Sequence, residues 1–351
     1  MRPTFSIIFF TVASGTGYGI WFLLGLGLAV YWPTCAAPGP KGPEGVSLRL
    51  CTYPLLIDYM LAAGFVLVTT GLLSSLGHLG KPRRAWRALS QWRSSWLSRE
   101  GVAALLTYLP AIGVVLPTIT GWWQTRTLSP TDAFTPWFSF EALRPIGVAL
   151  ALGALVTVYC TAHIYSSLKP IRAWHNRYVT PAYLLFALYG GLLWLWALST
   201  LPSGFIAVAT RTFETHATHA ALAITAAACA LLKFFYWRDI DRTPPISAGR
   251  ATGLDALGTV RTFEQPHTEE NYLTHEMGFV LARAHSRRLR AIALLSAFLA
   301  PALIAGAAAL LPFASNILAW PALAFGMLGL LVERWLFFAE AKHAVIGYYQ
   351  H

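Results

Sequence analysis

The sequence predicts an all-α polytopic membrane protein with eight transmembrane helices and both termini in the cytoplasm. Of its 351 residues, 56% are hydrophobic and 12% are charged, whereas about 25% of the residues in a soluble domain are charged. Apolar runs of about 20 residues, the length that crosses a bilayer as a helix, fill most of the chain. They leave no room for a soluble domain, so we expect a single membrane domain over residues 1–351.

Each span is predicted by a run dense in Leu, Ala, Val, Gly and Phe. Helices are expected for these runs because backbone groups in lipid must be hydrogen-bonded within the segment. The first run lacks a small-residue cleavage site near its end, so we interpret it as a span rather than a signal peptide. The predicted spans are 5–32, 53–77, 101–123, 144–168, 180–201, 216–236, 291–312 and 317–339.

The distribution of basic residues predicts the orientation. Of the Lys and Arg residues, 21 fall at the N-terminus, in the even-numbered connections and in the C-terminal tail, and five fall on the opposite side. Positive loops stay in the cytoplasm, so the net charge of +11 needs no nucleic acid to explain it. The cytoplasmic connection 237–290 is longer than orientation requires. Its helix-like part, 268–290, is either a platform for a partner protein or an interfacial helix lying on lipid.

Cysteine spacing excludes several kinds of site. Cys35, Cys51, Cys160 and Cys229 lack the close spacing of iron–sulfur or structural zinc ligands, and no phosphate-binding glycine loop is present. Cys35 and Cys51 share the first external loop, where an oxidising periplasm would allow a disulfide. Cys160 and Cys229 fall within spans, where we expect packing roles.

His78 and Glu100 are the first candidates for chemistry. His78 ends the second predicted span and Glu100 opens the third, so both lie at the cytoplasmic boundary at similar depth. An imidazole near a carboxylate can take and release protons as a quinone is reduced or a quinol is oxidised. The spacing alone favours a different interpretation, in which Gly80 and Pro82 stop one helix and Ser98 caps the next.

Two further polar groups lie near the predicted cytoplasmic face. Glu333 and Arg334 fall near the end of the eighth span, where they are expected to neutralise other buried charges, because adjacent helix residues do not face each other. The other group follows the fourth span and contains Lys169, Arg172, Trp174 and His175.

The histidines do not predict a haem. A bis-histidine haem needs two facing imidazoles at one depth. His216 and His219 fall at the external start of the sixth span, whereas His78 and His163 are near the internal face. We therefore expect no haem and no other metal in this chain.

The run GHLGKPRRAWRALSQWRSSWLSREG (Gly77–Gly101) resembles the signature loop of the DMSO reductase anchor subunit family. Four further runs, which begin at Phe5, Ile164, Pro266 and Glu333, resemble the branch found in sulfite-oxidising complexes. The resemblance covers nearly the whole chain. The long connection and the arginine-rich loop differ from the DMSO-reducing members and favour the sulfite-oxidising branch.

The resemblance implies a single eight-helix anchor domain in the bacterial inner membrane. It would hold a ferredoxin-like iron–sulfur subunit and a molybdopterin catalytic subunit on the cytoplasmic face, and it would exchange electrons with ubiquinone or menaquinone. The implied quinone site is formed by His78 and Glu100, with Trp86, Arg87 and Arg99 shaping or charging it. The implied docking residues are Lys81, Arg83, Arg84, Lys169, Arg172, Trp174 and His175.

Three alternatives remain open from the sequence. The same anchor could oxidise quinol for a DMSO-type reductase, with electrons flowing in the opposite direction. A secondary transporter would be favoured by corresponding broken helices in the two halves, and we find no such symmetry in the sequence. A pure scaffold would keep its anchoring role after mutation of His78 and Glu100.

Overall fold

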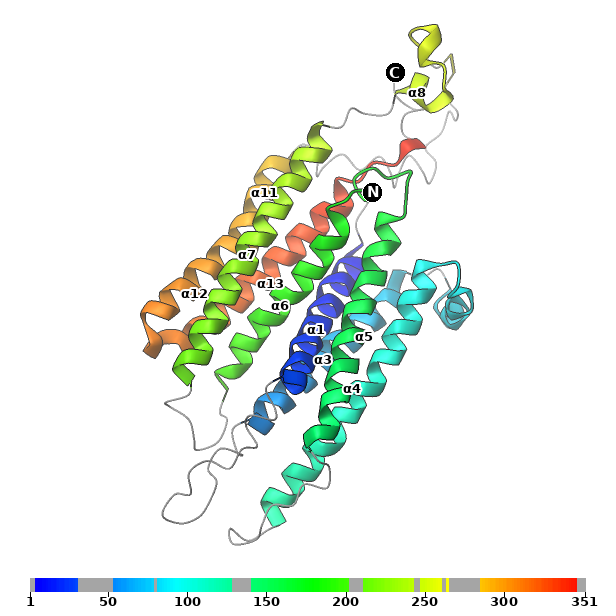
Figure 1. Ribbon diagram of the computed structural model, residues 1–351. Coiled ribbons are helices and arrows are strands. Elements are labelled where there is room, and N and C mark those ends of the chain that lie inside the picture. Colours follow the sequence, from blue (N-terminus) through cyan, green and yellow to red (C-terminus); the bar gives the residue numbers. More distant parts are fainter. Residues whose placement is uncertain are drawn as a thin grey trace.

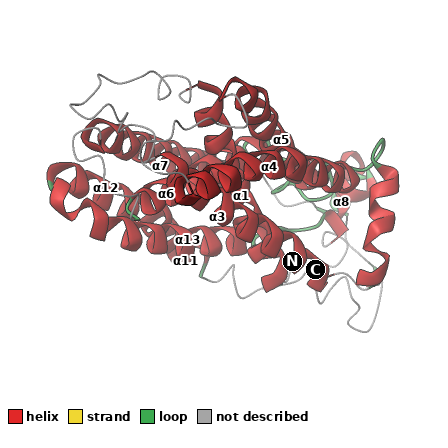
Figure 2. Cartoon of the chain, turned by 90° about the horizontal axis from the view of Figure 1, so that it is seen from below, coloured by secondary structure: helices red, strands yellow, loops and turns green. Residues whose placement is uncertain are grey.

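A computed structural model shows a helical bundle. Eight of its helices are long and apolar enough to cross a membrane, which confirms the predicted number of spans. They run side by side along the long direction of the molecule (Figure 1). Seen from below and coloured by secondary structure, the described elements are almost all helices (Figure 2). The structure describes residues 4–30, 53–78, 81–127, 140–201, 211–242, 247–260, 263–264 and 285–345.

The third span begins earlier than the sequence predicted. Helix α4 starts at Trp96, because the amide of Arg99 already donates to the carbonyl of Ser95 at 3.0 Å. The predicted cap, Ser98, therefore lies inside the first turn, which corrects that assignment, and Glu100 lies in the second turn. The elements of this half are α1 Phe5–Val30, α3 Tyr53–Ser75, η1 Leu76–His78, η2 Pro82–Gln91, α4 Trp96–Thr127 and α5 Phe140–Ser166.

The long connection is shorter at both ends than predicted. Helix α7 continues to Arg242, and α11 begins at Ser286, so residues 237–242 and 286–290 are helical continuations of spans. Residues 265–284 lie outside the described part of the chain, and so do Cys35 and Cys51. The elements of this half are α6 Val179–Ser199, α7 Arg211–Arg242, α8 Ala248–Thr252, η3 Asp255–Leu257, α11 Ser286–Leu294, η4 Leu295–Leu299, α12 Ala300–Leu310, η5 Pro312–Ala314 and α13 Ser315–Ala339.

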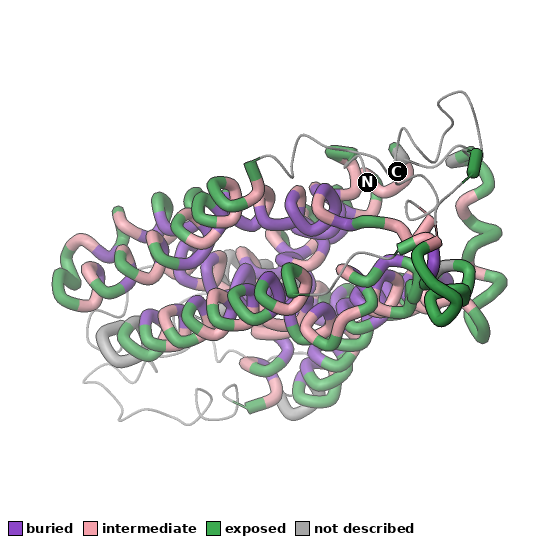
Figure 3. The backbone as a smooth tube through the Cα atoms, turned by 90° about the horizontal axis from the view of Figure 1, so that it is seen from above, coloured by how far each residue is buried: buried purple, intermediate pink, exposed green. Residues whose placement is uncertain are grey.

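Helices α1 and α6 form the centre of the bundle. Helix α1 packs against α3, α5 and α6, and α6 packs against α7 and α13. A Cβ at Gly19 would overlap the backbone of Ala187, and one at Gly191 would overlap Gly19. Small residues allow this close approach, which stabilises helix pairs in membranes. Figure 3 colours each residue by its burial, with buried residues inside the bundle and exposed residues on its outer helices.

The neighbour order is the same in the two halves. Helices α1, α3, α4 and α5 form one ring of contacts, and α6, α7, the α11–α12 span and α13 form a second ring in the same order. This repeat was not apparent from the sequences of the two halves. The two rings meet along α1 and α6, so the halves form one body.

Both described chain ends lie at the same end of the bundle (Figure 1). The Ser74 hydroxyl donates to the carbonyl of Ser6 at 3.1 Å, and the amide of Ala344 donates to the carbonyl of Pro170 at 2.9 Å. We call this end, with η1, η2 and the 167–178 loop, the basic end. Its exposed basic side chains include Lys81, Arg83, Arg84, Arg87, Arg93, Lys169, Arg172 and Arg177.

Candidate functional site

Glu100 is a buried carboxyl near the basic end of α4. Its residue is 5% exposed, and the Thr161 hydroxyl on α5 donates to Glu100 Oε1 at 2.5 Å. Within the described residues, no Lys, Arg or His lies within ion-pair distance of this carboxyl. A carboxyl held by a hydroxyl rather than by a cation can carry and release a proton during a reaction.

The loop before α4 folds back onto the start of that helix. The Ser98 hydroxyl donates to the carbonyl of Ala88 in η2, and a Cβ at Gly101 would lie 2.7 Å from the Leu89 side chain. Serine and glycine at these positions let η2 approach α4 closely. The signature loop is therefore held against the helix that carries Glu100.

The other residues of the predicted quinone site lie in three different surroundings. His78 is the last residue of η1, and its side chain lies outside the described part of the structure. Trp86 is 68% exposed and Arg87 is exposed too, on the outer side of η2. Arg99 turns toward the loop, where it donates to the Arg93 carbonyl at 2.7 Å. The structure thus brings Thr161 to Glu100, and it places Trp86 and Arg87 facing outward.

Three aromatic side chains pack together on the outer side of α4 and α5. The sequence did not indicate that they belong to this site. The rings of Trp96 and His163 have centroids 4.6 Å apart, and those of Tyr159 and His163 are 4.0 Å apart. The Arg99 guanidinium lies 4.3 Å from the centre of the Trp96 ring. We call Trp96, Tyr159 and His163 the outer stack. The available signal was the i, i+4 spacing of Tyr159 and His163, which places both on one face of a helix.

The predicted docking residues all lie at the basic end, and all but one of them are exposed. Trp174 is buried, and its indole donates to the carbonyl of Phe337 at 3.0 Å, so it supports the 167–178 loop from inside and offers no surface to a partner. The exposed members are Lys81, Arg83, Arg84, Lys169, Arg172 and His175.

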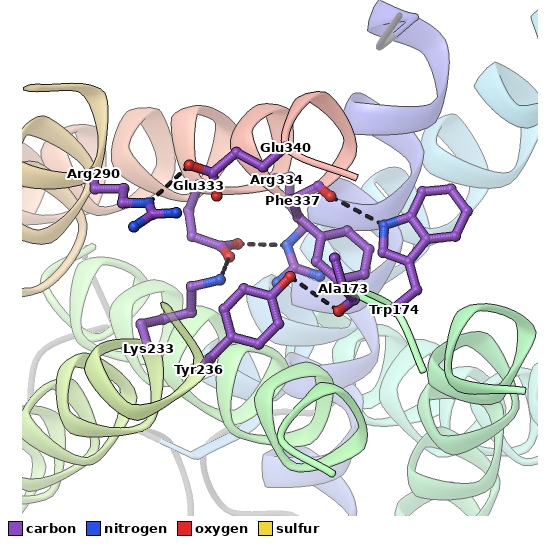
Figure 4. Close-up of polar contacts among 9 residues, drawn as sticks. All are labelled: Ala173, Trp174, Lys233, Tyr236, Arg290, Glu333, Arg334, Phe337 and Glu340. Atoms are coloured by element: carbon purple, nitrogen blue, oxygen red, sulfur yellow. Dashed lines mark hydrogen bonds and ion pairs between the residues drawn. The ribbon is translucent and has the colours of Figure 1, made fainter. Parts of the chain in front are cut away.

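A buried ionic network joins α7 to α13 (Figure 4). Lys233 Nζ lies 2.6 Å from Glu333 Oε1, and Arg334 Nε lies 2.5 Å from Glu333 Oε2. All three residues are at most 4% exposed. The expectation that these residues neutralise other buried charges is confirmed for Glu333, which pairs with Lys233. The expectation that Glu333 and Arg334 do not face each other is wrong, because their long side chains bend to the same enclosed side.

The network continues toward the surface of the basic end. Arg290 on α11 lies 2.8 Å from Glu340 and 2.6 Å from Asp241 at the end of α7. Burial raises the pKa of the Glu340 carboxyl, although the charge of Arg290 opposes this shift. Three cations and three anions therefore link α7, α11 and α13 at this end.

A small pocket adjoins the buried network. It has a volume of about 20 Å³ and lies between α1, α6 and α13, with Tyr183 and Arg334 among its lining residues. The Arg334 guanidinium lies 4.5 Å from the centre of the Tyr183 ring. A space of this size holds a water molecule when polar partners line it, and it is too small for a quinone ring.

The buried carboxyls differ in their partners, and this difference indicates different roles. Glu333 and Glu340 are paired with cations, as expected for charges that stabilise a fold. Glu100 has the hydroxyl of Thr161 instead. Among the buried carboxyls that the structure describes, Glu100 is thus the one suited to exchange protons with a substrate.

The chain is similar to membrane subunits of known oxidoreductases. The sequence model of the family described as DMSO reductase anchor subunit (DmsC) matches residues 55–243. A sulfite dehydrogenase subunit of Allochromatium vinosum is 30% identical over 363 residues, covering 100% of this chain and 99% of that protein. Anaerobic dimethyl sulfoxide reductase chain YnfH of Escherichia coli is 28% identical over 129 residues, covering 36% of this chain and 39% of that protein. No solved structure matches the chain.

The family match covers more than half of the chain, and the similarity to the Allochromatium vinosum protein extends over its whole length. The eight apolar helices agree with the role of a membrane anchor. An anchor subunit works with catalytic and electron-transfer partner subunits. This chain belongs to the DMSO reductase anchor subunit family.

Proposed function

We propose that the chain is the membrane anchor and quinone-reactive subunit of a heterotrimeric molybdopterin and iron–sulfur oxidoreductase that passes electrons from sulfite oxidation to the quinone pool. The observation that carries the quinone assignment is Glu100, a buried carboxyl with a hydroxyl partner at the end of the bundle that also has the exposed basic residues. The full-length similarity to a sulfite dehydrogenase subunit supports the choice of substrate.

The proposed reaction balances between the subunits. Sulfite takes an oxygen atom from water on the molybdopterin subunit and becomes sulfate, releasing two electrons and two protons. The electrons pass through iron–sulfur clusters of the second partner to a quinone near Glu100. Quinone gains two electrons and two protons and becomes quinol. In this chain, Glu100 supplies the two protons to the quinone oxygens one after the other and regains each from water at the basic end.

We further propose that the basic end faces the cytoplasm of a bacterium and that the partner subunits bind there. The positive charge of the exposed loops supports this orientation. Exposed Lys81, Arg83 and Arg84 on one loop and Lys169 and Arg172 on the next form a basic surface for an acidic partner. Charge complementarity of this kind steers association and fixes orientation.

The second candidate function is an anchor that oxidises quinol for a DMSO-type reductase. The partial similarity to a dimethyl sulfoxide reductase chain favours it. Electron flow then reverses, and Glu100 accepts the two protons that the quinol releases, one after the other, and passes each to water. The residues in this chain are the same, so the partner subunit determines the direction.

Purification of the native complex tests the proposal. The tagged chain is isolated from native membranes in mild detergent, and its partners and its molybdenum, iron and haem content are determined. We expect two co-purifying subunits with molybdenum and abundant iron, and no haem. The preparation should reduce decylubiquinone with sulfite, whereas sulfoxide-dependent oxidation of decylubiquinol would support the second candidate. Isolation of a lone, metal-free protein would contradict both.

A further inference from the structure

His163 in the outer stack has one ring nitrogen engaged and one available. Its Nδ1 lies 3.0 Å from the carbonyl oxygen of Tyr159. A carbonyl oxygen only accepts, so Nδ1 carries the hydrogen, and Nε2 of the neutral ring holds a lone pair. No residue in the described ranges hydrogen-bonds to this Nε2. The outer stack therefore presents a hydrogen-bond acceptor beside aromatic rings.

An apolar stripe on α5 leads to the outer stack. Val148, Leu152, Val156 and Tyr159 are 45%, 56%, 49% and 41% exposed. Their spacing of three or four residues places them on one face of the helix. Because α5 spans the membrane, this face meets the lipid chains. A molecule with an apolar tail along the stripe would bring its head to His163.

The outer stack lies one helical turn from Glu100 along α4, because Trp96 and Glu100 are four residues apart on one face of that helix. Thr161, which donates to Glu100, lies between Tyr159 and His163 on α5. On α4, Arg99 covers the Trp96 ring and is followed by Glu100. The stack is thus close to the buried carboxyl along α4, while Tyr159 and His163 lie on the face of α5 away from Thr161. An interfacial aromatic belt accounts for Trp96 and Tyr159, but it does not account for a histidine packed against both.

We propose that the outer stack is the lipid-side binding platform for the quinol headgroup, the product of the proposed reaction. Trp96 and Tyr159 pack against the ring, and His163 Nε2 accepts a hydrogen bond from a quinol hydroxyl. A quinol is a flat ring with two hydroxyls on an apolar tail, so it matches the rings, the acceptor and the stripe together. This inference rests on the proposed function, and it names the residues through which the quinol passes between the Glu100 site and the lipid.

Equilibrium binding of decylubiquinol to the purified complex tests the role of His163. His163→Phe keeps an aromatic ring and removes Nε2, and we expect it to raise the Kd about fivefold, the effect of one lost neutral hydrogen bond. His163→Gln restores an acceptor and should recover part of the loss. His285→Phe, at an exposed histidine of the basic end, is the matched control and should leave the Kd unchanged. Dye-linked turnover and the amounts of the co-purifying partners report the integrity of each variant.

Photolabelling with an azidoquinone locates the headgroup without relying on activity. We expect label on Trp96 or on the α5 segment that contains Tyr159 and His163. Label confined to other helices, or an unchanged Kd in both His163→Phe and Trp96→Leu, would overturn the platform, even if Glu100→Gln abolishes quinone-linked turnover. If the wild-type complex neither binds decylubiquinol nor reacts with quinone, the proposed function itself is wrong.

Discussion

At the scale of single residues, the environment of each buried acid determines its role. Glu333 lies between Lys233 and Arg334, whereas Glu100 contacts the Thr161 hydroxyl. The sequence identified Glu100 through the signature loop but gave no indication of Thr161, because 61 residues separate them. His163 was missed for the same reason, since sequence spacing does not tell which faces of two helices meet.

Thr161 should affect the reaction through Glu100. Thr161→Val keeps the shape of the side chain and removes the hydroxyl that donates to Glu100 Oε1. Loss of a hydrogen bond worth about 1 kcal/mol lowers the rate about fivefold, so quinone-linked turnover should fall by this factor and dye-linked turnover should not change. Thr161→Ser retains the hydroxyl and should be close to wild type. Equal rates in Thr161→Val and wild type would show that this bond is irrelevant to turnover.

Replacing Glu333 should lower the stability of the complex more than replacing Lys233. Glu333→Gln leaves two buried cations without an anion, which costs about 3–5 kcal/mol when a buried pair is broken. Lys233→Met fills similar volume and leaves Glu333 paired with Arg334. We therefore expect a larger fall in the thermal midpoint of the purified complex for Glu333→Gln. The opposite order would mean that the Lys233 ion pair, rather than the balance of charge, stabilises this part of the bundle.

At the scale of elements, the sequence predicted the number of helices better than their ends. Apolar runs mark the part of a helix that lies in lipid, and this signal located all eight spans. It ends where the helix becomes polar, so the start of α4 at Trp96 and the continuation of α7 to Arg242 were missed. The π-helical turn over Leu295–Leu299 has no hydropathy signal. This turn packs directly against α13, since a Cβ at Gly329 would overlap the backbone of Ala297.

Adding a single methyl group where α1 packs closely on α6 should lower the stability of the protein. Gly19→Ala would overlap the Ala187 backbone, and overpacking of this kind costs about 1–3 kcal/mol. Gly27→Ala, on the same helix with no atom within 4 Å of the added Cβ, should be neutral or slightly stabilising. Thermal midpoints of the two variants test this, and an equal effect would show that the α1–α6 contact tolerates added volume.

At the scale of the whole molecule, the fold gathers its polar groups at one end. The buried network, Glu100, the outer stack and the exposed basic loops all lie near the helix ends that meet at the basic end. The sequence predicted a common side for the loops from their charge. It did not predict the link between Lys233 and Glu333, because sequence spacing does not show which of the distant helices become neighbours.

The basic end should be accessible from the cytoplasm. Ser90→Cys places a thiol on the exposed side of η2, in a variant whose native cysteines are replaced by serine. A membrane-impermeant maleimide should label it in inverted vesicles and not in intact spheroplasts. Labelling from the outside would reverse the proposed orientation and place the partner subunits on the opposite face.

The central claim is that Glu100 connects the partner subunits to the quinone pool. The most direct measurement compares quinone-linked with dye-linked sulfite oxidation in membranes that contain the complex with Glu100→Gln, a substitution that keeps the size of the side chain and removes its ionisable proton. We predict that quinone-linked turnover is lost and dye-linked turnover stays at the wild-type level. Normal quinone-linked turnover in this variant would contradict the claim and leave the chain as an anchor without a quinone site at Glu100.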